Sequence, residues 1–171
     1  MLKLKTAMIL AIALVTAPMT MAAGNDVVVF DLQAAILNTD LAKKKVQDMQ
    51  ANAEFAALQA KFETLRNDLQ KMAKDAEKNA VTWNQEQAAE HRKKMEYARA
   101  DAELVAKKLQ AEQKATAQRV LEELGPKAQV VLKDVIAAEG IGLVLSTQTA
   151  YYAEPSRDIT AKVTEKLNKA K

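Results

Sequence analysis

The sequence predicts a mainly α-helical fold with a small β-containing body, from which a long antiparallel helical hairpin projects as a coiled-coil arm. Residues 41–124 contain no Gly or Pro and are rich in Ala, Lys, Gln and Glu, which favours continuous helix. Apolar residues repeat in heptads along most of this stretch. Short β-branched and apolar runs on both sides of it predict strands. We assign residues 23–41 and 125–171 to the body and residues 42–124 to the arm.

Residues 1–22 have the pattern of a secretory signal peptide. Lys3 and Lys5 precede an apolar run at 8–15 that is too short to anchor the chain in a bilayer. Small residues precede a cleavage point after Ala22. The sequence therefore predicts an exported protein whose mature chain begins directly after this segment, and the alternative is an uncleaved membrane anchor.

The charge of the mature chain argues against a nucleic-acid partner and leaves membrane contact open but unsupported. Removal of Lys3 and Lys5 lowers the 25 basic residues of the chain to 23, against 22 acidic residues, so the net charge becomes +1. Because acidic and basic residues are interleaved and form no basic stripe, we predict no nucleic-acid partner. The same near-neutral charge gives no support for membrane contact. Cysteine is absent, so the fold must be stabilised by packing or assembly without disulfides.

The mature chain is predicted to begin with a strand and a short helix. Residues 26–31 are a β-branched run of strand length, and residues 32–37 suit a short helix. Asn38, Thr39 and Asp40 follow, and any of them could cap the first helix of the arm.

Two heptad seams are the strongest signal in the sequence. In each seam, residues that are apolar or small, apart from His91 in the second seam, follow one another at alternating spacings of three and four, as in helices that pack along a coiled coil. Because a seam faces the partner helix, we expect its large residues to pack between the two helices of the arm. These residues are Phe55, Leu58, Phe62, Leu65, Leu69, Met72, Met95, Val105 and Leu109. Ala88, Ala98 and Ala102 on the second seam are small, so the outer half of the arm is expected to open easily.

The chain is predicted to reverse near residues 79–83, between the two seams. Asn79 and Thr82 weaken helix at this point, and Thr82 followed by Gln85 fits a capping box that starts a second helix. The alternative is a single unbroken helix, because Asn and Thr interrupt helices less strongly than Gly or Pro.

Beyond the arm, the sequence predicts a bent helix followed by a β-hairpin. Gly125 and Pro126 permit a bend, after which the helix continues to a stop at Gly140. The apolar runs 141–146 and 149–153 are separated by two polar residues and are predicted to pair as a hairpin.

A last amphipathic helix is predicted at the C-terminus. Ile159, Val163 and Leu167 are spaced by four, and Ser156 or Asp158 would cap the helix that carries them.

The body is predicted to associate with further copies of itself. Open strand edges are sites of further pairing, and so small a body buries little apolar surface alone. Assembly would cover the edges and enlarge the core. The strand residues expected in the body and its assembly are Val27, Val28, Val29, Phe30, Leu143, Val144, Leu145, Tyr151 and Tyr152.

The sequence predicts no enzyme, metal site or cofactor. His91 is the only histidine and has no partners at ligand spacing. Gly140-Ile141-Gly142 follows a helix and enters a strand, the reverse of the order in a nucleotide-binding loop, and lacks the third glycine. Glu122 and Glu123 lie on a solvated helix end, and no Ser, His and Asp cluster is suggested.

Across the whole mature chain, the order of elements resembles the Skp (OmpH) family of periplasmic chaperones. None of the matching parts is a catalytic motif, so the resemblance rests on order and architecture. The parts that carry it are the strand Val27-Val28-Val29-Phe30-Asp31, the Ala-, Lys- and Gln-rich hairpin, and the ending from Ile141-Gly142-Leu143-Val144-Leu145 through Ala150-Tyr151-Tyr152-Ala153 to Asp158-Ile159-Thr160.

This resemblance implies a periplasmic homotrimer whose helical arms surround a cavity for unfolded outer-membrane proteins, and a holding activity that uses no ATP. The better-known members are markedly basic, whereas the mature chain here is close to neutral. Electrostatic attraction to acidic clients or lipopolysaccharide is therefore not implied.

Apolar residues that miss the seams are the candidates for contact with such clients. They are Met49, Trp83, Tyr97 and Leu104, and ordinary packing or a solvated surface position is the alternative for each. The alternative function for the whole protein is a structural coiled-coil spacer or adaptor of the cell envelope. A spacer would need one continuous docking face, whereas a chaperone would need scattered weak contacts.

Overall fold

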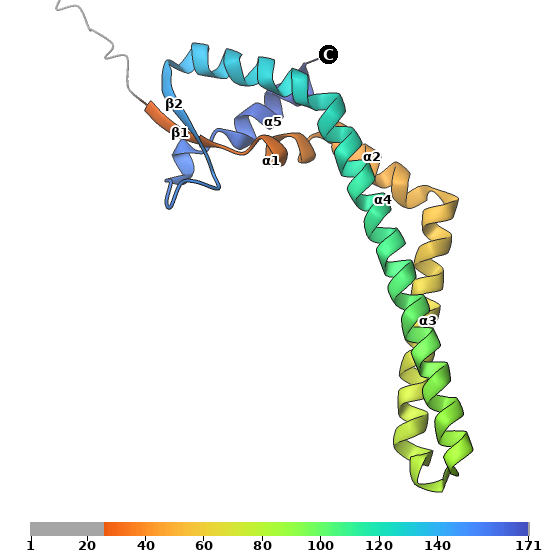
Figure 1. The fold of residues 1–171 in the computed structure, drawn as a ribbon. Helices are drawn as coiled ribbons and strands as arrows, with labels where there is room; N and C mark the ends of the chain where they lie inside the picture. The colour runs from red at the N-terminus through yellow and green to blue at the C-terminus, as the bar shows by residue number, and fades with distance from the viewer. Residues whose placement is uncertain (1–25, 171) are drawn as a thin grey trace, which may run out of the picture.

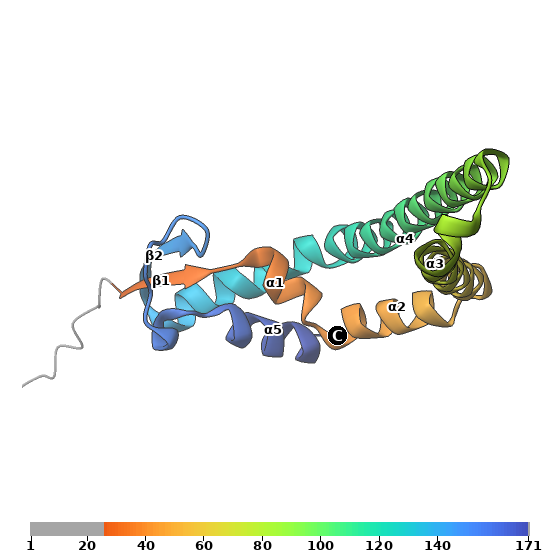
Figure 2. The ribbon, with the colours of Figure 1, turned by 90° about the horizontal axis from the view of Figure 1, so that it is seen from below.

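The computed structural model describes residues 26–170, so the predicted signal peptide lies outside the described residues. The described chain forms a body and an arm that together have the shape of an L (Figures 1 and 2). The arm consists of α3 (Ala53–Asn79) and the facing part of α4 (Gln85–Glu139), which run antiparallel. The predicted fold class, a helical hairpin on a base of short strands and helices, is confirmed.

The first elements of the body follow the sequence prediction closely. Strand β1 (Asp26–Phe30) leads into α1 (Leu32–Leu37), where Asp31 caps the helix by accepting a hydrogen bond from the backbone N–H of Ala34 at 2.8 Å. Of the three candidate caps for the next helix, the structure uses Thr39, whose hydroxyl accepts from the N–H of Ala42.

The expected continuous first helix of the arm is interrupted at Asn52, which corrects the prediction. Helix α2 (Asp40–Ala51) ends there, and α3 begins in a new direction (Figure 1). Asn52 has an extended backbone with ψ of 132°, and its side-chain oxygen accepts from the N–H groups of Glu54 and Phe55. An Asn cap therefore breaks this helix without Gly or Pro, because it satisfies the free N–H groups of the new helix.

The chain reverses through the 3-10 turn η1 (Ala80–Thr82), so the alternative of one unbroken helix is wrong. The predicted capping box is displaced by two residues. Asn84, and not Thr82, caps α4: its side chain accepts from the N–H of Gln87 at 2.8 Å, and the Gln87 side chain accepts from the N–H of Asn84 at 3.0 Å. Thr82 instead donates its hydroxyl to the carbonyl of Asn79.

Helix α4 belongs to both the arm and the body, because it continues through Gly125 and Pro126. Pro126 has no N–H to donate to the carbonyl four residues earlier, and this loss favours a bend. A side chain on the preceding residue would crowd the proline ring in helical conformation, and Gly125 has none. The helix changes direction between arm and body (Figure 1) and stops at Gly140, which is left-handed with φ of 64°.

The predicted β-hairpin of 141–146 with 149–153 is wrong. Strand β2 (Ile141–Ser146) forms, but it pairs in parallel with β1, in a register that joins Val27 to Leu143 and Val29 to Leu145. Residues 149–153 form no strand, so Tyr151 and Tyr152 do not lie in a sheet. The long α4 makes this pairing accessible, because it carries the chain back to the start of β1, as a crossover between parallel strands must.

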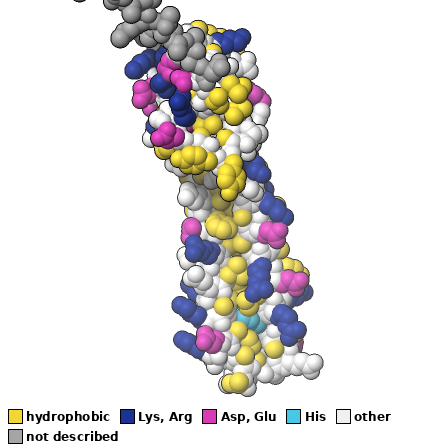
Figure 3. All heavy atoms as spheres, turned by 90° about the vertical axis from the view of Figure 1, so that its left-hand side faces the viewer, with side chains coloured by type: hydrophobic (Ala, Val, Ile, Leu, Met, Phe, Trp, Pro, Cys, Tyr) yellow, Lys and Arg dark blue, Asp and Glu magenta, His cyan; other side chains and the backbone are white. Residues whose placement is uncertain are grey.

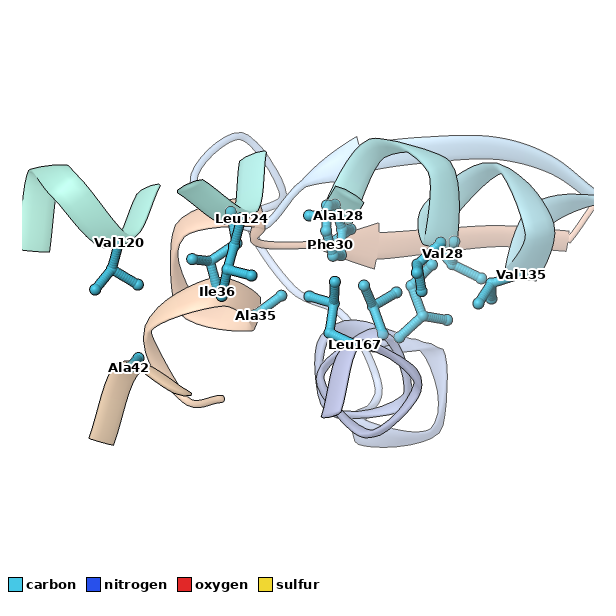
Figure 4. Close-up of a cluster of buried hydrophobic side chains, with 13 residues drawn as sticks. Val28, Phe30, Ala35, Ile36, Ala42, Val120, Leu124, Ala128, Val135 and Leu167 are labelled. Carbon is cyan, nitrogen blue, oxygen red and sulfur yellow. The ribbon is translucent and has the colours of Figure 1, made fainter. Parts of the chain in front are cut away.

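The core of the body lies between β1, the C-terminal part of α4, α1 and α5 (Thr160–Lys169). Figure 2 shows α1 and α5 beside this part of α4, and Figure 4 shows Val28, Phe30, Ala128, Val135 and Leu167 directed toward one another. Ile36 at 0% exposure is among the largest fully buried side chains.

Helix α5 and its N-cap residue carry the three apolar residues expected there, and Ile159, Val163 and Leu167 are all buried. No side chain caps the helix at its N-cap residue Ile159. Asp158 accepts from the N–H of Thr160 at 2.8 Å, and of the two predicted caps it is the one that contacts the helix start.

Candidate functional site

All nine predicted seam residues, which belong to α3 and α4, are at least partly buried. Phe55 and Val105 are buried, at 6% and 3% exposure, and the other seven are half-buried. Most of the residues between them on either helix are exposed. This pattern follows from the geometry of two helices, since each seam residue is covered by one partner helix only.

A two-helix arm cannot cover both edges of its seam, and apolar side chains consequently reach the surface. Figure 3 shows hydrophobic side chains gathered along the midline of the arm, on the side that lies beneath the body in Figure 1, with Lys and Arg along both flanks. Ala88, Ala98 and Ala102 are half-buried in the returning seam, and their small size leaves little apolar contact per turn. We call this apolar midline, where the half-buried seam residues of α3 and α4 reach the surface between charged flanks, the arm stripe.

A groove of about 320 Å³ opens on one edge of the seam. Its floor is formed by Phe62 and Leu69 from α3 and by Met95 and Ala102 from α4, together with Ala73 and Gln70. Two arginines, one from each helix, complete the lining: Arg66 and Arg99. We call this site the arginine groove.

The four candidate contact residues are not brought together. Met49 lies in α2 and lines cavities near the α2–α3 junction, away from the arm stripe. Trp83 is half-buried at the tip. Tyr97 and Leu104 are 61% and 53% exposed, and because they are seven residues apart they share one face of α4, pointing away from the seam. The Nζ of Lys93 lies 5.7 Å from the centre of the Tyr97 ring.

The tip is closed by an aromatic pair. The rings of Trp83 and His91 have their centroids 4.5 Å apart, and His91 Nε2 lies 3.9 Å from a carboxylate oxygen of Asp75. This nitrogen is buried and has no hydrogen-bond partner within residues 26–170. The arrangement favours the packing role of Trp83 over a freely exposed aromatic, because its ring already has a partner.

Two exposed ion pairs support the outer face of α4. The Lys94 ammonium lies 2.7 Å from the carboxylate of Glu90, and Lys107 lies 2.7 Å from that of Glu103. The hydrogen bond and the positive charge of each lysine hold the pKa of the glutamate below its ordinary value of 4.5. Both pairs are separated by four residues on a helix, with the glutamate first, which is the favourable orientation.

A cavity at the junction of α2 and α3 was not predicted from the sequence. It has a volume of about 330 Å³, and its lining includes Asn52, Phe55, Thr116 and Val120. It exists because α2 and α3 diverge at Asn52 while α4 passes both. An Asn directly before Ala-Glu-Phe was the available signal, since Asn at an N-cap starts a new helix.

The body exposes an apolar outer face on its two-stranded sheet. Val28 and Phe30 are directed into the core, and the alternation of side chains places Val27, Leu143 and Leu145 on the opposite side. These three residues, which we call the outer face, are 44%, 49% and 38% exposed. Tyr151 and Tyr152 follow in an exposed loop.

Two further observations concern the described residues as a whole. In the described part of the chain, no group of three or more His, Cys, Asp and Glu side chains is placed to hold a metal ion. Among helices within residues 26–170, none combines the length and apolarity needed to cross a membrane.

Comparison with known proteins gives a family match. A family model described as outer membrane protein (OmpH-like) matches residues 26–167. A crystal structure from Caulobacter crescentus CB15, named as a candidate OmpH-like outer membrane chaperone, is 21% identical, with 84% of each chain covered and a TM-score of 0.45. Among curated proteins, none matches this chain.

Proposed function

The chain belongs to the OmpH-like outer membrane protein family, and on that premise we propose that it is a periplasmic chaperone that holds unfolded outer-membrane proteins without ATP. The observation that carries the proposal is the arm stripe (Figure 3). An apolar surface with charged flanks binds exposed hydrophobic segments weakly and at many points, while the charges keep the arm soluble. Neither the binding nor the release of such segments requires chemical energy.

The packing of the arm would also let its two helices separate locally around a client. Its seam is half-buried along most of its length, and small residues occupy much of the returning helix. Few large apolar contacts therefore oppose local separation of α3 and α4 in the outer half of the arm, which lets the same surface adapt to segments of different size.

The holding activity is tested by measuring whether the protein prevents an unfolded client from aggregating. A urea-unfolded β-barrel protein is diluted into buffer with and without the mature chain, and light scattering is followed. We expect suppression at a stoichiometric ratio of the assembled protein to client, without nucleotide. Unchanged scattering would favour the spacer or adaptor function, which requires one fixed partner.

We further propose that the protein acts as a homo-oligomer joined through its body. Support comes from the outer face, because Val27, Leu143 and Leu145 expose apolar area that a second copy would remove from water. Three copies are what the family resemblance implies, and their arms would enclose a common space for the client.

Assembly is tested by sedimentation equilibrium of the mature chain and of Leu143→Asp. We expect a trimer for the unchanged protein and dissociation for the variant, since a buried carboxylate in the interface is costly. Val81→Asp at the 94% exposed tip position is the matched control and should remain assembled. A folded monomer of the unchanged chain at micromolar concentration contradicts the proposal.

A further inference from the structure

The arginine groove combines an apolar floor with two cationic side chains that form no ion pair with any described residue. Phe62, Leu69 and Met95 contribute the largest apolar side chains of the floor. Arg66 and Arg99 are exposed, and within residues 26–170 neither guanidinium is in an ion pair with a carboxylate. The nearby lysines differ, because Lys94 and Lys107 are paired with glutamates.

The heptad positions explain why both arginines reach the same edge. Arg66 directly follows the seam residue Leu65, and Arg99 directly follows the seam residue Ala98. Leu65 and Ala98 occupy the same position in the heptad. In an antiparallel pair of helices, the residues directly after this position lie on one edge of the seam in both helices. The residues directly before the other seam position lie on the opposite edge. No acidic residue lines this groove.

We propose that the arginine groove binds client segments in which apolar side chains alternate with carboxylates. This inference rests on the proposed function and specifies the chemistry of its clients. An apolar side chain would cover the floor, and a neighbouring Asp or Glu would accept hydrogen bonds from a guanidinium, whose planar donors match a carboxylate. A near-neutral protein would thereby prefer acidic segments without a large overall positive charge.

The test measures peptide binding to the full mature protein. The probe is a fluorescent, flexible peptide with two aromatic residues and two glutamates in a Gly-Ser background, and a second peptide carries lysines in place of the glutamates. We expect the unchanged protein to prefer the acidic peptide. The double substitution Arg66→Gln with Arg99→Gln should weaken its binding about tenfold, since it removes two exposed charge-assisted contacts of modest strength.

A matched control removes the same charge from the opposite edge. Lys61 precedes the seam residue Phe62, Lys108 precedes the seam residue Leu109, and both are exposed. Lys61→Gln with Lys108→Gln should leave acidic-peptide binding within about twofold, since it changes only screened long-range charge. Circular dichroism of both double variants verifies that the helices are retained.

Four results would overturn the groove proposal. Equal losses of acidic-peptide binding in the two double variants would mean that the peptide is attracted by the overall charge of the arm. Unchanged binding in the arginine variant would mean that the peptide does not bind in the groove. Binding of anionic phosphatidylglycerol vesicles that depends on both arginines, without peptide binding, would assign the groove to lipid. If the unchanged protein suppresses aggregation but ignores the acidic peptide, only the groove proposal fails. If it binds the peptide through the arginines but does not suppress aggregation, the chaperone proposal fails instead.

Discussion

The indole of Trp83 stacks on the imidazole of His91 at the tip of the arm, with ring centroids 4.5 Å apart and planes inclined by 37°. The pair joins the turn between the helices to the first turns of α4, while Asp75 approaches His91 from α3. Three segments of the tip therefore meet at one imidazole ring.

Replacement of Trp83 should loosen the tip without affecting the body. An aromatic pair contributes about 0.5–1.5 kcal/mol beyond its buried area, so Trp83→Ala should accelerate amide hydrogen exchange at the tip several-fold. Tyr97→Ala is the control, because Tyr97 is 61% exposed and lies outside the seam. Equal exchange in Trp83→Ala and the unchanged protein would exclude a packing role for Trp83.

The start of α4 should depend on Asn84 and much less on Thr82. Asn84→Ala removes the side chain that accepts from the N–H of Gln87, and such losses cost about 0.5–2 kcal/mol. Thr82→Ala removes only a hydroxyl that donates to the carbonyl of Asn79 in the turn. We expect faster amide exchange in the first turn of α4 for Asn84→Ala. A larger effect of Thr82→Ala would mean that Thr82, as the sequence suggests, and not Asn84, caps α4.

Gly140 should not tolerate a side chain. Its φ of 64° lies in the left-handed region, where alanine is disfavoured by about 1–2 kcal/mol. Urea unfolding followed by circular dichroism should therefore show a lower midpoint for Gly140→Ala. Gly142→Ala, in strand β2, is the comparison, because among the glycines of residues 26–170 only Gly140 has a positive φ. Equal midpoints for Gly140→Ala and the unchanged protein would contradict this reading.

Glu90 should titrate below 4.5, because Lys94 stabilises its charged form. A carboxyl group with a lowered pKa contributes stability above the pKa of the unfolded chain and loses it as the pH falls through the folded value. Helix support from this exposed pair is thus present at neutral pH and disappears in acid. Carbon-13 NMR titration of the side-chain carboxyl should show the pKa rising in Lys94→Ala. Glu103, which pairs with Lys107, should titrate as before in that variant.

Much of the fold was predictable because the relevant signals are local. Helix seams depend on residues within one or two turns, and Phe55 through Leu109 repeat with the period of packed helices. The stop at Gly140 and the short helix 32–37 also follow from neighbouring residues, and the structure confirms both. The arginine groove was missed because it depends on which residues two distant segments bring to the same edge.

By itself, the sequence determined the helical periodicity, the reversal between the two seams and the apolar faces that form the core. Only the tertiary structure decided that Ile141–Ser146 pairs with Asp26–Phe30, and not with the apolar run that follows it. Strand pairing depends on which backbone edge is brought alongside, and here the long α4 returns the chain from the tip of the arm and places β2 next to β1.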